Sequence, residues 1–260
     1  MDDIKKSIIF DLPVSYKNIK IYPAIVRDYN RFMAYSECLS LEKNSIPDPK
    51  IISMTELEYL YYLYQIDEKP YLIWFDRVLS ICLRDNEKEF ENIAESAKRY
   101  KLDDKRKPFF TINGEKYTAK DFAEIKKIIC MQNDLELPDE NISKEVRDSL
   151  EKAKLYKNKT GDEKLATLED YIVSLAILTG WNFDYIYDMT IRKFTRCLKR
   201  MDLYIHYKIF LAASMSGMVE FKDKSFIKHW LNGLDSNTYK DVSVDLSTVQ
   251  DKISFESAKQ

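Results

Sequence analysis

Glycine and proline are scarce in this chain of 260 residues, which contains 5 glycines and 7 prolines. Average usage is about 7% for glycine and about 5% for proline, and no proline follows Pro138. Leucine, isoleucine, lysine, glutamate and tyrosine are abundant instead. Hydrophobic residues make up 45% of the chain, enough to form a sizeable core. We therefore expect a mainly α-helical protein.

An excess of charge of one sign is also lacking. Lys and Arg total 41 and Asp and Glu total 43, so the net charge is -2. This balance argues against a nucleic-acid protein whose whole surface is basic, although it allows a local basic face. The longest apolar run, 203–219, contains His206 and Lys208 and is shorter than the roughly 20 residues of a membrane span. Since no secretory signal opens the chain, we expect a soluble, cytoplasmic protein.

Catalytic motifs are missing as well. The patterns GxGxxG, GxxxxGK[ST], GxSxG and HExxH do not occur. His206 and His229 have no nearby Ser or Cys in a recognisable arrangement. Cys197 lies nine positions before His206, which places the two on opposite sides of a helix, so they cannot share a metal ion. We expect no enzymatic activity, no cofactor and no metal site.

The cysteines show no pairing pattern. Cys38, Cys82, Cys130 and Cys197 lie far apart, and the chain has no CxxC motif. Each lies in an apolar pattern with helical spacing. They are therefore interpreted as reduced thiols buried in the core of an intracellular protein.

Two short β-hairpins are predicted near residues 8–22 and 109–118. In the first, the apolar run 8–12 is the expected first strand. In the second, Asn113 and Gly114 lie between two β-prone runs and specify a type I′ turn, because both turn residues need a positive φ. The second hairpin either pairs with the first, which would shelter the edges of both, or forms a wing that contacts nucleic acid.

The remaining pattern predicts a multi-helix bundle. Apolar periodicity, with capping signals at Ser53 or Thr55, at Thr118 and at Thr167, favours helices over 24–42, 56–65, 71–84, 122–131, 143–156, 171–179, 191–213 and 224–234. A polar linker is predicted at 158–166. It separates an N-terminal region (1–157), which carries both hairpins, from a C-terminal helical domain (167–235), and a polar tail follows at 236–260.

The helix over 191–213 is predicted to be the central one. Its apolar arc consists of Ile191, Phe194, Leu198, Met201, Ile205, Ile209 and Ala212. The opposite side first carries a basic arc of Arg192, Lys193, Arg196, Lys199 and Arg200, and then becomes apolar at Leu203, Phe210 and Leu211. We therefore expect exposure near 192–200 and burial along the C-terminal half. The basic arc is a solvated helix face, a phosphate-binding face, or a site for an acidic helical partner.

A short motif precedes that helix. Ser174-Leu175-Ala176-Ile177-Leu178-Thr179-Gly180-Trp181 is followed by Phe183-Asp184-Tyr185-Ile186, Asp188-Met189-Thr190-Ile191 and Phe194. Gly180 is expected to end one helix, and Asn182 and Thr190 to cap the next two. Over residues 175–194 the pattern resembles the helical segment of tail assembly chaperones of bacteriophages and phage-derived contractile tails.

The resemblance implies a non-enzymatic protein of the host cytoplasm that binds the elongated, helical tape-measure protein during tail assembly. The candidate partner-binding residues are Trp181, Phe183, Tyr187, Arg192, Arg196 and Arg200. Trp181 could instead fix the helix turn to the core. A structural component retained in the virion tail, with or without homo-oligomerisation, would fit the same pattern. A DNA-binding regulatory protein would use the basic helix face.

Overall fold

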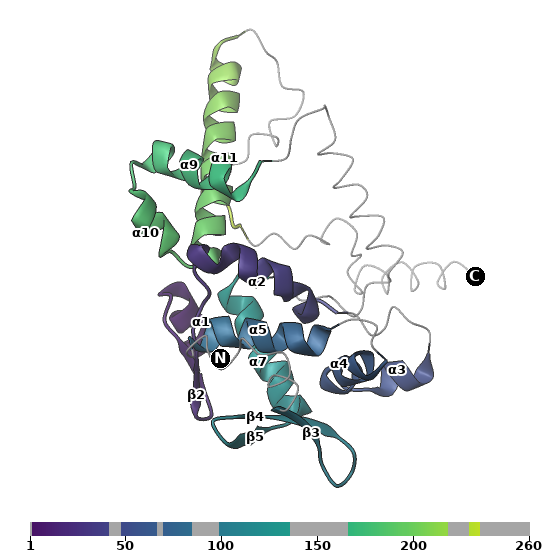
Figure 1. Cartoon of the computed structure of the whole chain (residues 1–260). Helices are drawn as coiled ribbons and strands as arrows, with labels where there is room; N and C mark the ends of the chain where they lie inside the picture. The colour runs from purple at the N-terminus through teal and green to yellow at the C-terminus, as the bar shows by residue number, and fades with distance from the viewer. Residues whose placement is uncertain are drawn as a thin grey trace, which may run out of the picture. The chain divides into compact units, whose positions relative to one another are not determined.

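The computed structural model describes residues 2–41, 48–66, 70–84, 99–135, 166–217 and 229–234. These residues are mostly helical and include two small antiparallel sheets (Figure 1), so the predicted fold class is confirmed. The chain divides into two compact units, Met1–Thr195 and Arg196–Gln260. The predicted helix at 143–156 and the tail at 236–260 lie outside the described residues, as does the predicted linker except for residue 166.

The chain begins with a helix rather than a strand. Helix α1 (Asp2–Ile9) is followed by a hairpin of β1 (Val14–Tyr16) and β2 (Ile19–Ile21). The predicted hairpin is therefore present, but the strand expected over 8–12 is wrong. The Phe10 N–H donates to the Lys6 carbonyl (3.1 Å) and the Leu12 N–H to the Ser7 carbonyl (2.8 Å). These local bonds satisfy the backbone of the apolar run, which therefore needs no partner strand.

Most helices of the N-terminal part lie close to the predicted ranges. The helix predicted over 24–42 is observed as η1 (Val26–Asp28), α2 (Tyr29–Ser36) and η2 (Glu37–Leu39), and the next predicted ranges correspond to α4 (Glu56–Gln65), α5 (Tyr71–Leu83) and α7 (Ala119–Gln132). Helix α3 (Pro49–Ser53) was not predicted. The capping signals at Thr55 and Thr118 are confirmed. Each of these side chains forms a reciprocal capping box, with Glu58 and Asp121 respectively.

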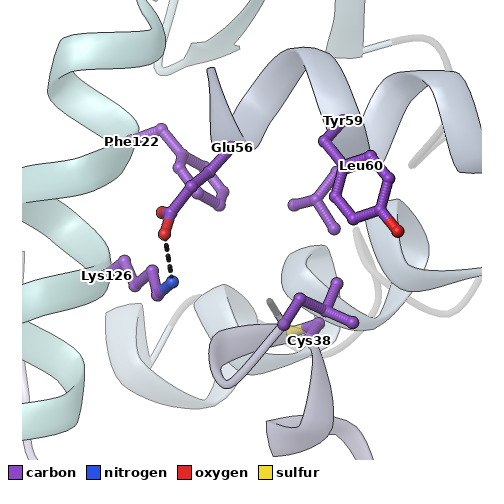
Figure 2. A pocket seen from close by; sticks show the side chains of 7 residues that line it. Cys38, Glu56, Tyr59, Leu60, Phe122 and Lys126 are labelled. Atoms are coloured by element: carbon purple, nitrogen blue, oxygen red, sulfur yellow. Dashed lines mark hydrogen bonds and ion pairs between the residues drawn. The ribbon is translucent and has the colours of Figure 1, made fainter. Parts of the chain in front are cut away.

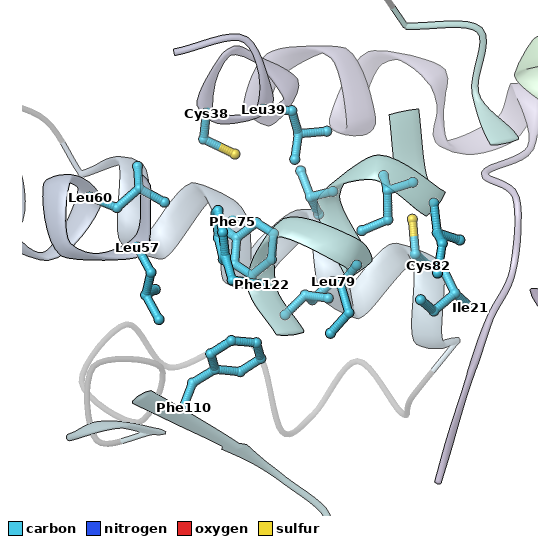
Figure 3. Packing of buried hydrophobic residues seen from close by; sticks show 14 of the residues in the cluster. Ile21, Cys38, Leu39, Leu57, Leu60, Phe75, Leu79, Cys82, Phe110 and Phe122 are labelled. Carbon is cyan, nitrogen blue, oxygen red and sulfur yellow. The ribbon is translucent and has the colours of Figure 1, made fainter. Parts of the chain in front are cut away.

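Helix α5 lies at the centre of the core, and ten of its 13 residues are buried. It packs against α2, α4 and β2. The ring of Phe75 lies 4.4 Å from that of Phe122 and 6.0 Å from that of Phe110, measured between centroids (Figure 3). The prediction that the helix over 191–213 is central is therefore wrong. A helix that is apolar on all sides belongs in the core, and α5 fits that description better.

A second sheet contains β3 (Tyr100–Leu102), β4 (Pro108–Ile112) and β5 (Glu115–Tyr117), in that order. Asn113 and Gly114 have φ values of 51° and 76°, as the predicted turn requires. The sequence did not predict β3, which covers the free edge of β4. The expectation that the two hairpins pair with each other is wrong, because they belong to separate sheets among the residues that the structure describes.

Side chains connect the two hairpins instead. Asp121, at the start of α7, accepts a hydrogen bond from the Tyr16 hydroxyl (2.8 Å) and forms an ion pair with Lys17 (2.8 Å). The Tyr117 hydroxyl donates to the side-chain oxygen of Asn18. The first hairpin is thereby held against the second hairpin and the helix that follows it.

Three of the four cysteines are buried, as predicted: Cys38, Cys82 and Cys130. Burial raises the pKa of all three thiols, to about 11 for Cys130. They therefore behave as apolar core side chains. Cys197 departs from the prediction because it is only half-buried, in the more exposed part of its helix.

The C-terminal elements are α9 (Leu168–Thr179), α10 (Phe183–Tyr187) and α11 (Ile191–Met215). Their predicted boundary signals are confirmed. Thr167 opens α9 through a capping box, and Gly180 closes it with a φ of 74°. Asn182 accepts a hydrogen bond from the Tyr185 N–H (2.8 Å), and Thr190 accepts one from the Lys193 N–H (3.2 Å). These signals depend on neighbouring residues only, which is why the sequence reveals them.

The burial predicted for α11 is wrong. Its buried residues, Ile191 and Phe194, lie at its N-terminal end, whereas Ile209 is 57% exposed and Phe210 is only half-buried. The cause is a long-range contact, an isolated antiparallel bridge between Ile25 and Thr190. It brings the start of α11 to the N-terminal core. A helical wheel shows which side chains share a face, but it cannot show which end meets a neighbour.

The prediction of a helix over 224–234 is also wrong for the residues that the structure describes. Residues 229–234 form turns, and residues 224–228 lie outside the described ranges. The Asn232 N–H donates to the His229 carbonyl (3.0 Å), and the Leu231 N–H donates to the His229 ring (3.2 Å). These short-range bonds replace the helical pattern.

Candidate partner-binding surface

Helix α9 is apolar on its outer side as well as its inner side. Ile172 and Leu175 are buried, and the helix packs against α10. On the outer side, Tyr171 is 46% exposed, Leu178 57% and Ile177 76%. A helix with two apolar sides is normally enclosed by protein. Here one of those sides faces solvent, which is typical of a protein-protein contact.

The exposed apolar region continues through the turn into α10. The ring of Trp181 meets that of Tyr185 edge-on, with centroids 5.2 Å apart, and the ring of Phe183 stacks on that of Tyr187 at 6.3 Å. Beneath them, Ile186 is fully buried. We call the following exposed side chains the α9–α10 surface: Tyr171, Val173, Ile177, Leu178, Trp181, Phe183 and Tyr185.

This surface is fixed to the N-terminal part of the protein. The Val26 N–H donates to the Met189 carbonyl (2.9 Å), and the Ile191 N–H donates to the Ala24 carbonyl (2.9 Å). Arg27 forms ion pairs with Asp188 (2.8 Å) and Asp184 (3.4 Å). Backbone and side-chain contacts therefore hold α10 and its aromatic residues in place.

The structure brings three of the predicted site residues together in α10 and the turn before it. Trp181 is 36% exposed and Phe183 48%. Trp181 does not belong to the buried core, and its ring contact is with Tyr185 rather than with core residues. Tyr187 is half-buried, and the Arg27 guanidinium lies 5.2 Å from the centre of its ring. Trp181 and Phe183 thus remain the more accessible contact residues.

The four members of this surface on α9, and Tyr185 on α10, were not predicted from the sequence. A signal was present, because residues 171–178 are almost continuously apolar and cannot form a single stripe. A short helix on the surface packs one face against the protein, and its other face is buried only where a second layer of protein covers it. Continuous apolar character in a short helix could therefore have indicated the exposed side of α9.

The other three predicted site residues lie on α11 and are half-buried. Arg192 belongs to the first compact unit, and Arg196 and Arg200 belong to the second. Arg200 donates hydrogen bonds to the carbonyl oxygens of Trp230 and Asn232, the latter at 2.9 Å. Lys193, from the same basic arc, pairs with Asp11. Part of the basic arc therefore serves contacts within the chain.

A small pocket between α4 and α7 contains a partly buried charged pair (Figure 2). Lys126 is 5% exposed, and its ammonium group lies 2.6 Å from the carboxylate of Glu56. Cys38 and Phe122 also line this space, which measures about 10 Å³. That volume is close to the minimum for one water molecule. The pocket therefore has no room for an organic ligand, and the buried Cys38 thiol has a raised pKa that disfavours a nucleophilic role.

The comparison with known proteins concerns the part of the chain that carries the exposed helices. Residues 157–235 match the family model of the YomV second domain. The match is to a phage-derived family and covers less than a third of the chain. No curated protein and no solved structure matches the chain. All of α9, α10 and α11 lie in the matched region, so the α9–α10 surface belongs to it.

Among the described helices, none combines the length and the hydropathy of a membrane-spanning segment.

Proposed function

We propose that this chain is a non-enzymatic phage protein that binds a helical partner through the α9–α10 surface. The observation that carries the proposal is the exposure of seven large hydrophobic side chains on two adjoining short helices and the turn between them. Exposed apolar groups of this kind mark interaction sites in soluble proteins, and aromatic residues are enriched at such sites.

The energetics of association determine how much of this surface a partner must cover. Full burial of a side chain the size of Leu or Phe contributes about 1.5 to 3 kcal/mol. Association itself costs an estimated ~4 to 15 kcal/mol in lost freedom of motion. Several of the seven side chains must therefore be buried together, which requires a partner that covers both α9 and α10. The contacts that hold α10 in place limit the further cost of ordering it.

We further propose that the partner is the tape-measure protein and that the chain acts as a tail assembly chaperone. Support comes from the motif over residues 175–194, which resembles that family, and from the match of residues 157–235 to a phage-derived family. A chaperone of an elongated helical protein must shield apolar helix faces before the tail tube encloses them. An exposed, pre-ordered apolar surface suits that task. A structural protein retained in the virion tail would use the same surface.

The basic arc supports a DNA-binding function less well. Lys193 and Arg200 contact Asp11 and the carbonyls of Trp230 and Asn232 within the chain. Phosphate binding would have to displace these contacts.

Co-expression of the full chain with the tape-measure protein of the same phage tests the proposal. We expect the two proteins to co-purify and the partner to become more soluble. Ile177→Ser combined with Leu178→Ser should abolish co-purification. Ile52→Ser is the matched control, because Ile52 on α3 is 46% exposed but lies outside the surface.

Failure of the wild-type chain to co-purify with this protein would contradict the tape-measure assignment. Equal co-purification of the surface variant and the control would contradict the site. Presence of the chain in purified particles would favour the structural role over the chaperone role.

A further inference from the structure

The charged residues within the segment that carries the α9–α10 surface are all acidic. Between residues 166 and 191 the sequence contains four acidic residues and no Lys or Arg: Glu169, Asp170, Asp184 and Asp188. All four are exposed. A partner that covers the apolar side chains must therefore lie next to carboxylates at both ends of the surface.

Hydrogen bonds hold the Asp170 carboxylate at the α9 end in its ionised form. The pKa of Asp170 is lowered, first by the hydrogen bond from the Thr167 backbone N–H (2.7 Å) and then by the bond from the Thr167 hydroxyl (2.7 Å). Asp170 precedes Val173 and Ile177 by three and seven positions, so the three residues share one stripe of the helix. Its negative charge thus lies at the end of the exposed apolar stripe.

The carboxylates at the α10 end are only partly neutralised. Arg27 pairs with both Asp184 and Asp188, but the Asp184 side chain is 84% exposed and its distance to the guanidinium is 3.4 Å. One cation therefore serves two carboxylates. A positively charged group on a partner would therefore also interact favourably with the carboxylates at the α10 end.

The surface also restricts the secondary structure that a bound partner segment can have. Its side chains lie on α9, on α10 and on the turn between them, none of which is a β-strand, so the surface offers no strand edge for β-pairing. A partner segment buried there must satisfy its own backbone hydrogen bonds, and a helix does so. At about 1.5 Å per residue, α9 is roughly 18 Å long, which matches about three turns of a bound helix.

Building on the proposed function, we propose that the α9–α10 surface selects an amphipathic helix of about three turns whose apolar stripe is flanked by Lys or Arg. The apolar stripe covers Ile177, Leu178 and Trp181. The flanking cations reach Glu169 and Asp170 at one end and Asp184 at the other. Affinity comes mainly from the apolar contact, and the carboxylates discriminate between partners by the sign of their flanking charge.

Two synthetic peptides test this inference against the full chain. Both carry the same leucine stripe, and one has lysine and the other glutamate at every flanking position. Fluorescence anisotropy should give a dissociation constant about tenfold lower for the lysine peptide at about 0.05 M salt, with the difference narrowing as salt rises. Glu169→Lys combined with Asp184→Asn should reduce the preference at least threefold. The control Glu124→Lys, at an exposed position on α7, should leave it unchanged.

Ile177→Ser should weaken binding of both peptides, because the apolar contact is common to them. Equal affinity for the two peptides, or a preference for the glutamate peptide, would overturn the charge selection. If that occurs while the natural partner still co-purifies with the wild-type chain, the proposed function stands and only the partner chemistry is wrong. If the chain binds phosphatidylcholine vesicles in preference to either peptide, the proposal that its partner is a helix is wrong.

Discussion

The Thr190 hydroxyl donates a hydrogen bond of 2.9 Å to the carboxylate of Asp11, which lies 179 positions earlier in the chain. The second carboxylate oxygen of Asp11 pairs with the Lys193 ammonium at 2.8 Å. Asp11 has a φ of 56°, a left-handed conformation that Asp and Asn tolerate better than most residues. One strained turn after α1 therefore fastens the start of α11 to the N-terminal part of the protein.

Replacing this carboxylate should loosen the attachment. Asp11→Asn keeps the size and the left-handed turn but removes the charge that faces Lys193. We expect the free energy of unfolding to fall by about 1 kcal/mol, since the hydrogen bond to Thr190 can persist and the Lys193 side chain is 48% exposed. Urea unfolding measures this, with Asp104→Asn at an exposed turn as the control. A loss no greater than that of the control would show that the ion pair contributes nothing to stability.

Local signals explain which parts of the fold the sequence predicts. The capping boxes at Thr55, Thr118 and Thr167, the Asn113-Gly114 turn and the Gly180 helix end all depend on residues within a few positions of one another. Such signals act before tertiary contacts form and are readable from sequence. The helices that they begin or end are accordingly predicted at close to their observed bounds.

Long-range contacts explain what the sequence did not predict. Strand β3 has only three residues, and its existence depends on pairing with β4. The burial of the start of α11 depends on the bridge from Ile25 to Thr190. In the candidate site, Trp181, Phe183 and Tyr187 stood out in the sequence, whereas Tyr185 and the exposed residues of α9 did not. Their exposure depends on which side of the helix the rest of the chain covers.

Asp121 should make stability depend on pH in the acidic range. Partial burial raises the pKa of Asp121. Hydrogen bonds from Lys17, the Thr118 backbone and Tyr16 lower this pKa by more than burial raises it, so the pKa lies well below its usual value. A lowered pKa in the folded state stabilises the protein above the unfolded pKa of about 4, and this contribution disappears as pH falls through the folded value.

We therefore expect wild type to be more stable than Asp121→Asn at pH 7 and the difference to shrink progressively below about pH 4. Urea unfolding at pH 7, 5, 4 and 3 measures the difference. Glu124→Gln, also on α7, should show a smaller change. A constant difference between wild type and Asp121→Asn across this range would mean that the carboxylate acts through packing rather than charge.

Two phenylalanines distinguish the core helix from the exposed one. Phe75 on α5 is fully buried, whereas Phe210 on α11 is half-buried and stacks on His206 at 6.1 Å. Phe75→Ala should cost about 3 to 5 kcal/mol, the range for emptying an aromatic core site. Phe210→Ala should cost less than half as much. Denaturant melts of both variants give the comparison, and the opposite order would restore α11 as the central helix.

Ile172 and Ile177 offer the sharpest comparison, because they are the same residue type on one helix with opposite surroundings. Ile172 is 7% exposed and Ile177 is 76% exposed. Ile172→Ala should cost about 2 to 5 kcal/mol, since it leaves a cavity, whereas Ile177→Ala should change the free energy of unfolding by less than about 0.5 kcal/mol. Partner binding should respond the other way: Ile177→Ala should weaken it, and Ile172→Ala should not while the protein remains folded. Urea unfolding and co-purification, carried out on the same two preparations, measure both effects. If Ile177→Ala instead destabilises the chain as much as Ile172→Ala, the outer side of α9 is covered by the protein itself and cannot be the partner-binding surface.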